Sequence, residues 1–236
     1  IPDDVKIIGN SSFWGCRTLT MINIPDGVML IDSAAFSNCT SLANVIISNS
    51  VKTIETSAFA SCAALASVTL GSGVERIIST AFSDCYKLVE VINNSRFNIE
   101  NGDYENGQIG KYALNIKKGG TTDIVNKNGF LFYTYENENY LLGYVGKDTA
   151  LTLPNDYNGQ TYKIYQYAFN GRNDLTSVVI SNGATVIGAL AFYNCRGLTN
   201  ITIGSSVTSI EASAFRNCVA LKNLSISNGV VSIGAG

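Results

Sequence analysis

The feature that most constrains the fold of this chain is an internal repeat with a period of 23 residues. Its marker is a phenylalanine that follows an isoleucine by five residues and precedes a leucine by six. The marker positions fall in two blocks: Phe13, Phe36, Phe59 and Phe82, then Phe169, Phe192 and Phe215. A single unit buries too little apolar surface to offset the entropy lost on ordering it, so the units must stack. Stacked units predict a repeat solenoid whose aligned strands form a parallel sheet.

Within one unit the residue types predict three short elements. Residues 42–47 are rich in β-branched side chains with alternating burial and favour a strand. A turn at Asn49-Ser50 and a second extended piece at residues 51–54 follow. Residues 57–62 are predicted to form a single helical turn, with Phe59 and Cys62 on one face.

The repeat resembles the BspA-like class of leucine-rich repeats. The resemblance rests on the pattern Val-x-x-Ile-x-x-x-Ala-Phe-x-x-Cys-x-x-Leu-x-x-Val-x-Ile. Residues 51–70 follow this pattern except at the last position, where a leucine replaces the isoleucine. The resemblance covers roughly residues 1–92 and 153–236, and it implies a right-handed superhelix with a parallel β-sheet on the concave face. It also implies a bacterial surface or secreted protein that acts in adhesion. The buried asparagine of the commoner repeat is replaced by Gly or Ser (Gly27, Ser50, Gly73, Gly183, Ser206, Gly229), so no asparagine ladder is expected.

The repeat is interrupted once. Residues 1–92 hold repeats one to four, residues 93–152 form a Tyr-rich insertion, and residues 153–236 hold repeats five to eight, the last truncated; together they are expected to form one continuous solenoid domain. Ten of the twelve tyrosines lie between Tyr104 and Tyr167. In the insertion, residues 129–135 and 140–144 predict a small antiparallel hairpin around a polar turn at 136–139, and 112–116 and 124–125 predict further strands. Four extra residues within 156–160 lengthen the turn before Ile164.

Six cysteines occupy one column, three residues after each marker phenylalanine except at Arg172. Three interpretations are open: small buried apolar residues, disulfides between successive repeats, or metal ligands. The first is favoured, and all six thiols are predicted to be reduced and buried. No metal site is proposed, because the chain contains neither Cys-x-x-Cys nor histidine.

Two surfaces are candidates for binding. The first is the hairpin, where Tyr133, Tyr135, Tyr140 and Tyr144 are expected to include at least two exposed rings, although aromatic residues there could equally attach the hairpin to the solenoid. The second is the outward face of the strands. Its candidate residues are Asn44, Ser67, Glu90, Ser177, Asn200 and Asn223.

Composition excludes several classes of function. The absence of histidine disfavours Ser–His–Asp, Cys–His and most zinc-dependent catalysis. A net charge of −2 gives no basic footprint for nucleic acid, and no apolar run is long enough to span a bilayer. No catalytic residue and no cofactor is therefore assigned.

The favoured hypothesis is a non-enzymatic, extracellular or cell-surface module that binds protein or glycan on host or neighbouring cells. The alternatives are a structural spacer within a larger surface protein and a glycosidase that uses two carboxylates. A signal and an anchor are expected outside these residues. Core-type residues at both ends, such as Val5 and Ile233, predict a longer protein with at least one more repeat beyond Gly236, or self-association through the open ends of the solenoid.

Overall fold

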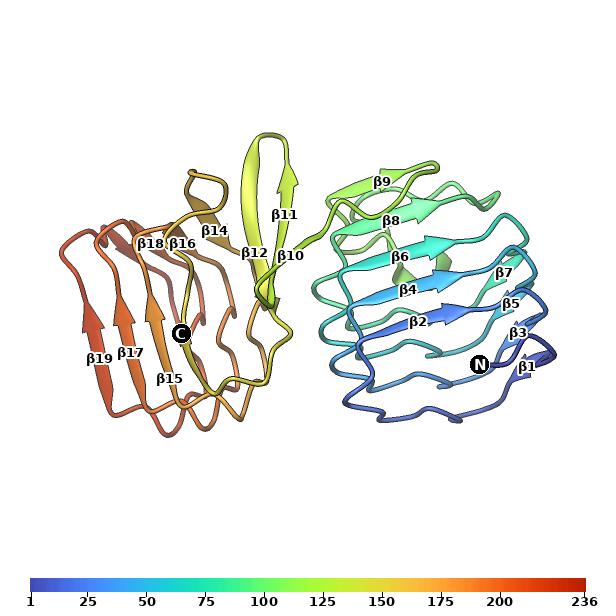
Figure 1. Cartoon of the computed structure of the whole chain (residues 1–236), viewed down its shortest axis with the longest axis horizontal. Helices are drawn as coiled ribbons and strands as arrows, with labels where there is room; N and C mark the ends of the chain where they lie inside the picture. Colours follow the sequence, from blue (N-terminus) through green and yellow to red (C-terminus); the bar gives the residue numbers. More distant parts are fainter. The chain divides into compact units, whose positions relative to one another are not determined.

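The computed structural model describes residues 1–236 and divides into two compact units, Ile1–Thr122 and Asp123–Gly236. We call them unit 1 and unit 2, and we call each turn of roughly 23 residues a coil. Both are built from short strands with almost no helix (Figure 1). No helix in the structure combines the length and the apolar character that crossing a membrane would require.

Unit 1 has two parallel sheets, and each of its first four coils contributes one strand to both. The longer strands form what we call the main sheet: β2 (Met21–Ile24), β4 (Asn44–Ile47), β6 (Ser67–Leu70), β8 (Glu90–Asn93) and β9 (Asn115–Lys117). The two-residue strands form the short sheet: β1 (Ile7–Ile8), β3 (Leu30–Ile31), β5 (Thr53–Ile54) and β7 (Arg76–Ile77). Met21 pairs with Asn44, and Asn44 with Ser67, so residues one period apart lie side by side. The predicted solenoid with a 23-residue turn and a parallel sheet is confirmed.

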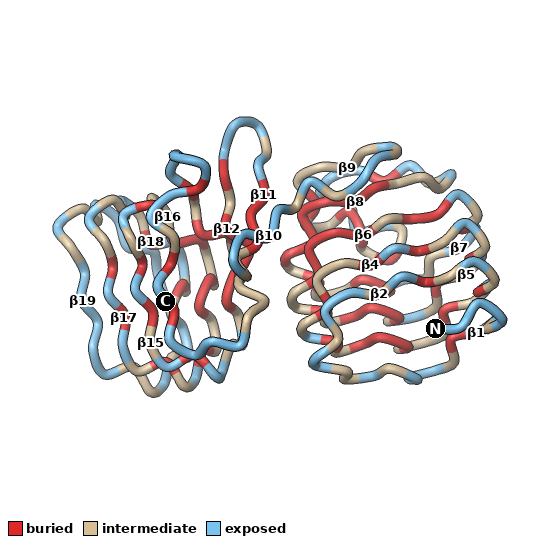
Figure 2. The backbone as a smooth tube through the Cα atoms, viewed as in Figure 1, coloured by how far each residue is buried: buried red, intermediate tan, exposed pale blue.

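The phenylalanine column shows why the coils must stack. Phe36, Phe59 and Phe82 are buried, and their rings stack with centroids 5.2 and 5.1 Å apart and interplanar angles of 4° and 7°. Each ring therefore covers the apolar face of the next, which a lone coil could not do. Buried residues run through the inside of every central coil (Figure 2).

The predicted helical turn at residues 57–62 is wrong. Ser57 and Ser61 have positive φ values of 55° and 58°, which no right-handed helix allows. The amide of Phe59 donates instead to the carbonyl of Ala81 in the next coil, at 2.8 Å. Because this amide donates to the next coil, its N–H points along the solenoid axis. The residues with positive φ on either side of it, Ser57 and Ser61, turn the chain so that the amide has this direction.

A fifth coil in unit 1 lies where the sequence predicted an insertion. Strand β9 pairs with β8 in parallel, Glu90 opposite Asn115, and the 3₁₀ turn η1 (Asn106–Gln108) takes the place of the Ala-Phe turn. The amide of Phe82 donates to the carbonyl of Gly107 at 2.8 Å, the bond that Phe59 makes to Ala81. This segment thus adds a further coil to the main sheet, although it has no strand in the short sheet and its sequence columns are lost.

Unit 2 begins with the predicted hairpin. Strands β10 (Val125–Lys127), β11 (Phe130–Tyr135) and β12 (Glu138–Tyr144) are antiparallel, and β12 then pairs in parallel with β14 (Tyr162–Ile164). The hairpin is confirmed, with a tighter turn than expected: Glu136 and Asn137 alone form it, at φ values of 49° and 63°.

The remaining strands of unit 2 repeat the arrangement of unit 1. The main sheet contains β13 (Ala150–Thr152), β15 (Ser177–Ile180), β17 (Asn200–Ile203) and β19 (Asn223–Ile226). The short sheet continues from β14 through β16 (Ala184–Ile187), β18 (Ser209–Ile210) and β20 (Ser232–Ile233). Leu141 on β12 pairs with Ile164, 23 residues later, so the hairpin strand is already in phase with the repeat.

Candidate functional site

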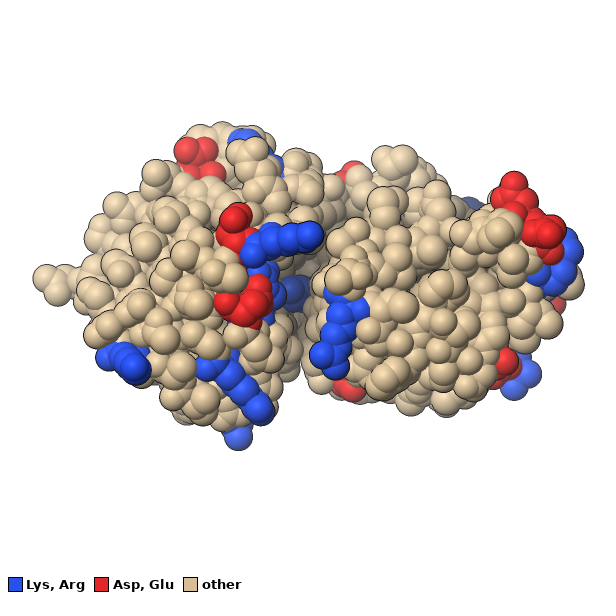
Figure 3. Space-filling model, turned by 60° about the horizontal axis from the view of Figure 1, so that its bottom comes forward, with Lys and Arg blue, Asp and Glu red and all other residues tan.

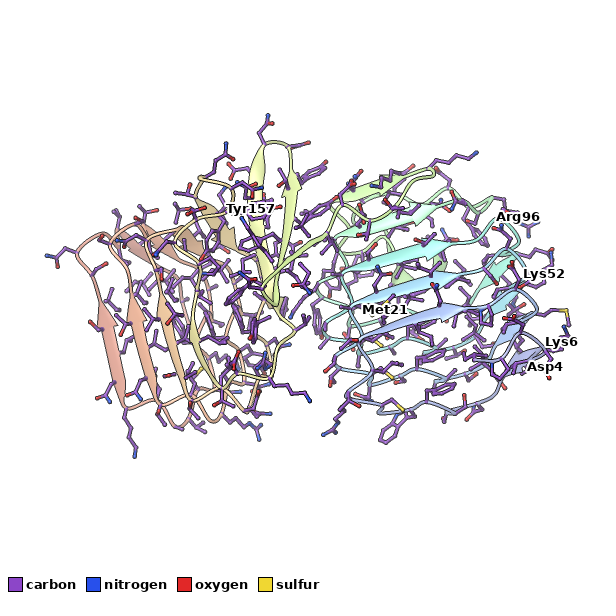
Figure 4. The ribbon with its side chains drawn as sticks, in the orientation of Figure 1. Asp4, Lys6, Met21, Lys52, Arg96 and Tyr157 are labelled. Atoms are coloured by element: carbon purple, nitrogen blue, oxygen red, sulfur yellow. The ribbon has the colours of Figure 1, made fainter.

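The outward face of the main sheet in unit 1 contains three of the candidate residues. Asn44 is half-buried, whereas Ser67 and Glu90 are 1% and 0% exposed. The expectation that the last two present their side chains to solvent is therefore wrong. Met21, on the first strand of this sheet, is 56% exposed (Figure 4).

Glu90 is held by polar partners within unit 1. Ser67 Oγ donates to Glu90 Oε2 at 3.0 Å, and Lys117 Nζ lies 3.0 Å from Glu90 Oε1. A buried carboxylate is tolerated only when it is paired and hydrogen-bonded in this way. Lys117 belongs to β9, in the coil that the repeat pattern did not reveal, so sequence reasoning could not anticipate this ion pair.

The main sheet of unit 2 presents a different outward face. Asn200 and Asn223 are exposed and Ser177 is half-buried, while Val178 and Ile201, the alternate residues, are buried. Asn223 Nδ2 donates to Asn200 Oδ1 at 2.5 Å, and Asn200 Nδ2 donates to Thr199 Oγ1 at 2.9 Å.

A second column on the same face continues this chemistry. Val179, Thr202 and Ser225 are all exposed and lie opposite one another in register. Together with Ser177, Asn200 and Asn223 they form a six-residue surface that we call the unit 2 face. It offers hydroxyls, amides and one apolar side chain, and none of the six is charged.

The four hairpin tyrosines are less exposed than predicted. Tyr133 is 1% exposed, and Tyr135, Tyr140 and Tyr144 are half-buried, so none is largely exposed. The ring of Tyr140 packs edge-on against Tyr165, with centroids 5.6 Å apart. The ring of Tyr144 packs 4.7 Å from that of Phe130, and its hydroxyl donates to Asp148, a bond that raises the pKa of the phenol.

One face of the hairpin closes the apolar core of unit 2. Phe132 and Leu141 are fully buried in that core, and Phe132 stacks on Tyr157 with centroids 4.3 Å apart. Tyr157 belongs to the lengthened turn, and Figure 4 places it beside the hairpin. Asn139 Nδ2 donates to Gln160 Oε1 at 3.1 Å and to the Thr161 carbonyl at 3.2 Å. The lengthened turn therefore holds the hairpin in place. This agrees with the interpretation that aromatic residues attach the hairpin to the solenoid.

Arg172 stands where the column would place a cysteine, and its side chain fixes the end of β12 and the segment that follows. Its guanidinium donates to the carbonyls of Tyr144 and Asp148 at 3.0 and 3.3 Å, and forms a bidentate pair with Asp174 at 2.9 and 2.8 Å. The hydrogen bond from Arg172 holds the pKa of Asp174 below its usual range. A cysteine could reach none of these acceptors, which gives the departure from the column a structural reason.

The cysteines are free, and they form a ladder of their own. Each thiol from Cys39 onward donates to the carbonyl of a phenylalanine 26 residues earlier, in the preceding coil, at distances of 3.0–3.2 Å. The prediction of buried free thiols is confirmed for Cys39, Cys62, Cys85 and Cys195, whereas Cys16 and Cys218 are half-buried. Burial raises the pKa of Cys85 to about 12 and that of Cys62 well above its ordinary value. The thiols of Cys62 and Cys85 are therefore hydrogen-bond donors and poor nucleophiles.

One depression of about 570 Å³ lies beside β2 in unit 1, with Asp3 and Asp26 among its lining residues. Both carboxylates are exposed and stand one period apart. A glycosidase needs one carboxyl group that burial keeps protonated near neutral pH. Neither carboxyl group of the depression is buried, and no cluster of three or more potential metal ligands occurs in the chain.

These observations define a class of protein: a β-solenoid of leucine-rich coils that stack through parallel sheets. Comparison with known families is more specific. The family model of the BspA type leucine rich repeat region matches residues 1–110 and 149–236 in six copies, and the chain belongs to this family.

Similar structures come from bacteria. A leucine-rich repeat protein from Bacteroides capillosus is 27% identical, over 48% of this chain and 88% of that chain, with a TM-score of 0.43. A leucine rich cell surface protein from Faecalibacterium prausnitzii is 23% identical, over 100% of this chain and 71% of that chain, with a TM-score of 0.33. No curated protein matches the chain.

Proposed function

We propose that this chain is a non-catalytic binding module that acts outside the bacterial cell and recognises protein or glycan through the unit 2 face. The observation that carries the proposal is the exposure of polar side chains in both columns of this face, since Asn200, Thr202, Asn223 and Ser225 are all exposed. Extended solenoid faces of this kind suit long, shallow ligands.

The chemistry of the face favours hydrogen bonding over charge attraction. Hydroxyl and amide groups both donate and accept, so they suit sugar hydroxyls and peptide backbones alike. Charged residues are few in the chain, at 14%, and most of the face drawn in Figure 3 is uncharged. A highly charged partner is thus disfavoured.

An extracellular location is supported by the family and by the name of the Faecalibacterium prausnitzii structure, a cell surface protein. Free buried thiols suit such a location in a reducing or anaerobic niche, where disulfides are not required.

The test is a screen of the whole chain against a glycan array and immobilised matrix proteins, followed by variants of any hit. Asn200→Arg and Thr202→Arg put bulky cations on the unit 2 face and should abolish binding. Thr208→Arg is the matched control, because Thr208 is exposed on the short-sheet side of the same coil.

Two outcomes count against the proposal. Binding that survives both variants would place the ligand on another surface. A chain that binds nothing in either screen would favour the structural spacer, whose role needs only the rigid stack of coils.

A further inference from the structure

Tyr104 is an exposed aromatic residue that the fold does not explain. Its side chain is 69% exposed, and no other large apolar side chain between residues 93 and 122 is exposed. It lies in the fifth coil of unit 1, just before η1, among the polar residues 101–106. Neither the core nor the repeat pattern requires a tyrosine at this position.

The ring belongs to an ordered cluster. Lys111 Nζ lies 4.9 Å from the ring centroid of Tyr104 and 5.1 Å from that of Tyr112, and it donates to Gln108 Oε1 at 3.3 Å. An ammonium placed over two aromatic faces is attracted to both. Desolvation lowers the pKa of Lys111, but the hydrogen bond to Tyr112 and the nearby Tyr104 and Asp84 more than offset it, so the pKa is raised. The lysine therefore stays charged and holds the rings in place.

The cluster is also anchored to the regular coils. The ring of Tyr112 packs edge-on against Tyr86 with centroids 5.4 Å apart, and Tyr86 Oη donates to Asp84 Oδ1 at 2.8 Å. Tyr86 and Asp84 belong to the turn of the fourth coil, next to Cys85. These contacts hold the cluster in place before a ligand binds, which reduces the side-chain entropy that the protein loses on binding.

The chemistry of the cluster selects its ligand. A sugar ring has an apolar C–H face that lies on an aromatic ring, and a rim of hydroxyls that needs amide and ammonium partners. A protein partner would favour several large apolar anchors in a well-packed patch. Asp84, Asp103 and Glu105 outnumber the single cation Lys111, so an acidic sugar or a nucleic acid is disfavoured.

We infer that Tyr104, Gln108, Lys111 and Tyr112 form a subsite for one neutral hexose or N-acetylhexosamine ring of a glycan. The subsite goes beyond the proposed function, because it lies in unit 1 and does not depend on the unit 2 face.

The experiment is saturation-transfer NMR on the whole chain with the methyl glycosides of glucose, galactose, mannose, N-acetylglucosamine and N-acetylgalactosamine. We expect transfer to at least one of them. Tyr104→Ala should weaken its affinity roughly 2- to 12-fold, the factor expected for one aromatic contact. Tyr104→Phe should retain the affinity, because the ring face is kept.

Trp14→Ala is the matched control, since Trp14 is also an exposed aromatic residue of unit 1, at 58%, but lies outside the cluster. It should leave the affinity unchanged, and circular dichroism should show all variants folded. The inference is overturned if none of the five glycosides receives saturation, or if Tyr104→Ala binds as the wild type does. Capture of a polypeptide through Tyr104 without any sugar binding would also overturn it. Loss of binding in Asn200→Arg but not in Tyr104→Ala would support the unit 2 face alone.

Discussion

Gly107 is the residue on which the fifth coil of unit 1 depends, and its replacement gives a sharp test. Its φ is +70°, and a Cβ there would lie 2.7 Å from Ile77 Cγ2 and 2.9 Å from Ala81 Cβ. An L-residue in the left-handed region costs about 1–2 kcal/mol. Overpacking a filled core adds roughly 1–3 kcal/mol. Gly107→Ala should therefore destabilise unit 1 by about 2–5 kcal/mol.

Gly102 supplies the matched control. Its φ is +81°, but nothing lies within 4 Å of the position of a Cβ. Gly102→Ala should cost only the backbone term, about 1–2 kcal/mol.

The assay is urea unfolding, monitored through the fluorescence of Trp14, the single tryptophan, which lies in unit 1. Hydrogen exchange at the Phe82 amide adds a local measure, because that amide donates to the Gly107 carbonyl. Gly107→Ala should speed this exchange and Gly102→Ala should not. Equal effects of the two substitutions on stability and exchange would refute the close packing of η1 on the fourth coil.

Three further predictions concern the positions around the cysteine column. Arg172→Cys, which completes the column, should destabilise unit 2 by roughly 1.5–3 kcal/mol in urea because two backbone carbonyls lose a charged donor, whereas Arg216→Ala on the exposed surface should have little effect. In the native protein, a thiol reagent should modify the half-buried Cys16 and Cys218 first, and after denaturation it should count six thiols; fewer would contradict the assignment of free cysteines. Between pH 9.0 and about 12 the folded state keeps a proton on Cys85 that the unfolded chain loses, so stability should fall as pH rises, by about 1.4 kcal/mol per pH unit for this thiol. Urea titrations across that range should show a shallower fall for Cys85→Ala.

The stacking of the coils could be predicted from the sequence because each column carries one physical requirement. A phenylalanine every 23 residues can satisfy its burial only against the next phenylalanine, and the ring stacks from Phe13 to Phe82 follow from that. The hairpin was equally predictable, since two apolar segments flanked the polar residues Glu136 and Asn137.

The conformation of the turn could not be read from the same columns. A spacing of three residues between Phe59 and Cys62 fits a helical turn and a pair of β-turns equally well. The discriminating signal lay at the position before the cysteine. There stand Gly, Asn, Ser or Asp, residues that adopt positive φ at low cost, as at Asn38, Ser61, Asp84 and Asn194. The position before the alanine also has positive φ but gives no such signal, since residues such as Ala34 and Leu190 stand there.

The candidate site was only partly accessible from the sequence. Alternation along β17 correctly placed Asn200 and Thr202 outward, because one face of the strand must be buried. The same rule gave the wrong exposure for Glu90, whose environment includes Lys117 from a coil without recognisable columns. Tyr104 was missed for the same reason, since nothing marked its segment as a coil whose outer surface could be considered.

The cysteine ladder explains how this repeat dispenses with the asparagine ladder of the commoner leucine-rich repeat. Each coil leaves one lone pair of a phenylalanine carbonyl open to a donor from the next coil, because its other bond comes from an amide of the same coil, as Phe36 accepts from the Cys39 amide at 3.3 Å. The thiol of the next coil supplies that donor, as Cys62 does for Phe36 at 3.2 Å. A disulfide between Cys39 and Cys62 would remove both thiol donors and leave the carbonyls of Phe13 and Phe36 with only the amide bonds of their own coils. The thiols are therefore structural in their protonated, reduced form, and oxidation should loosen the stack that the phenylalanines hold together.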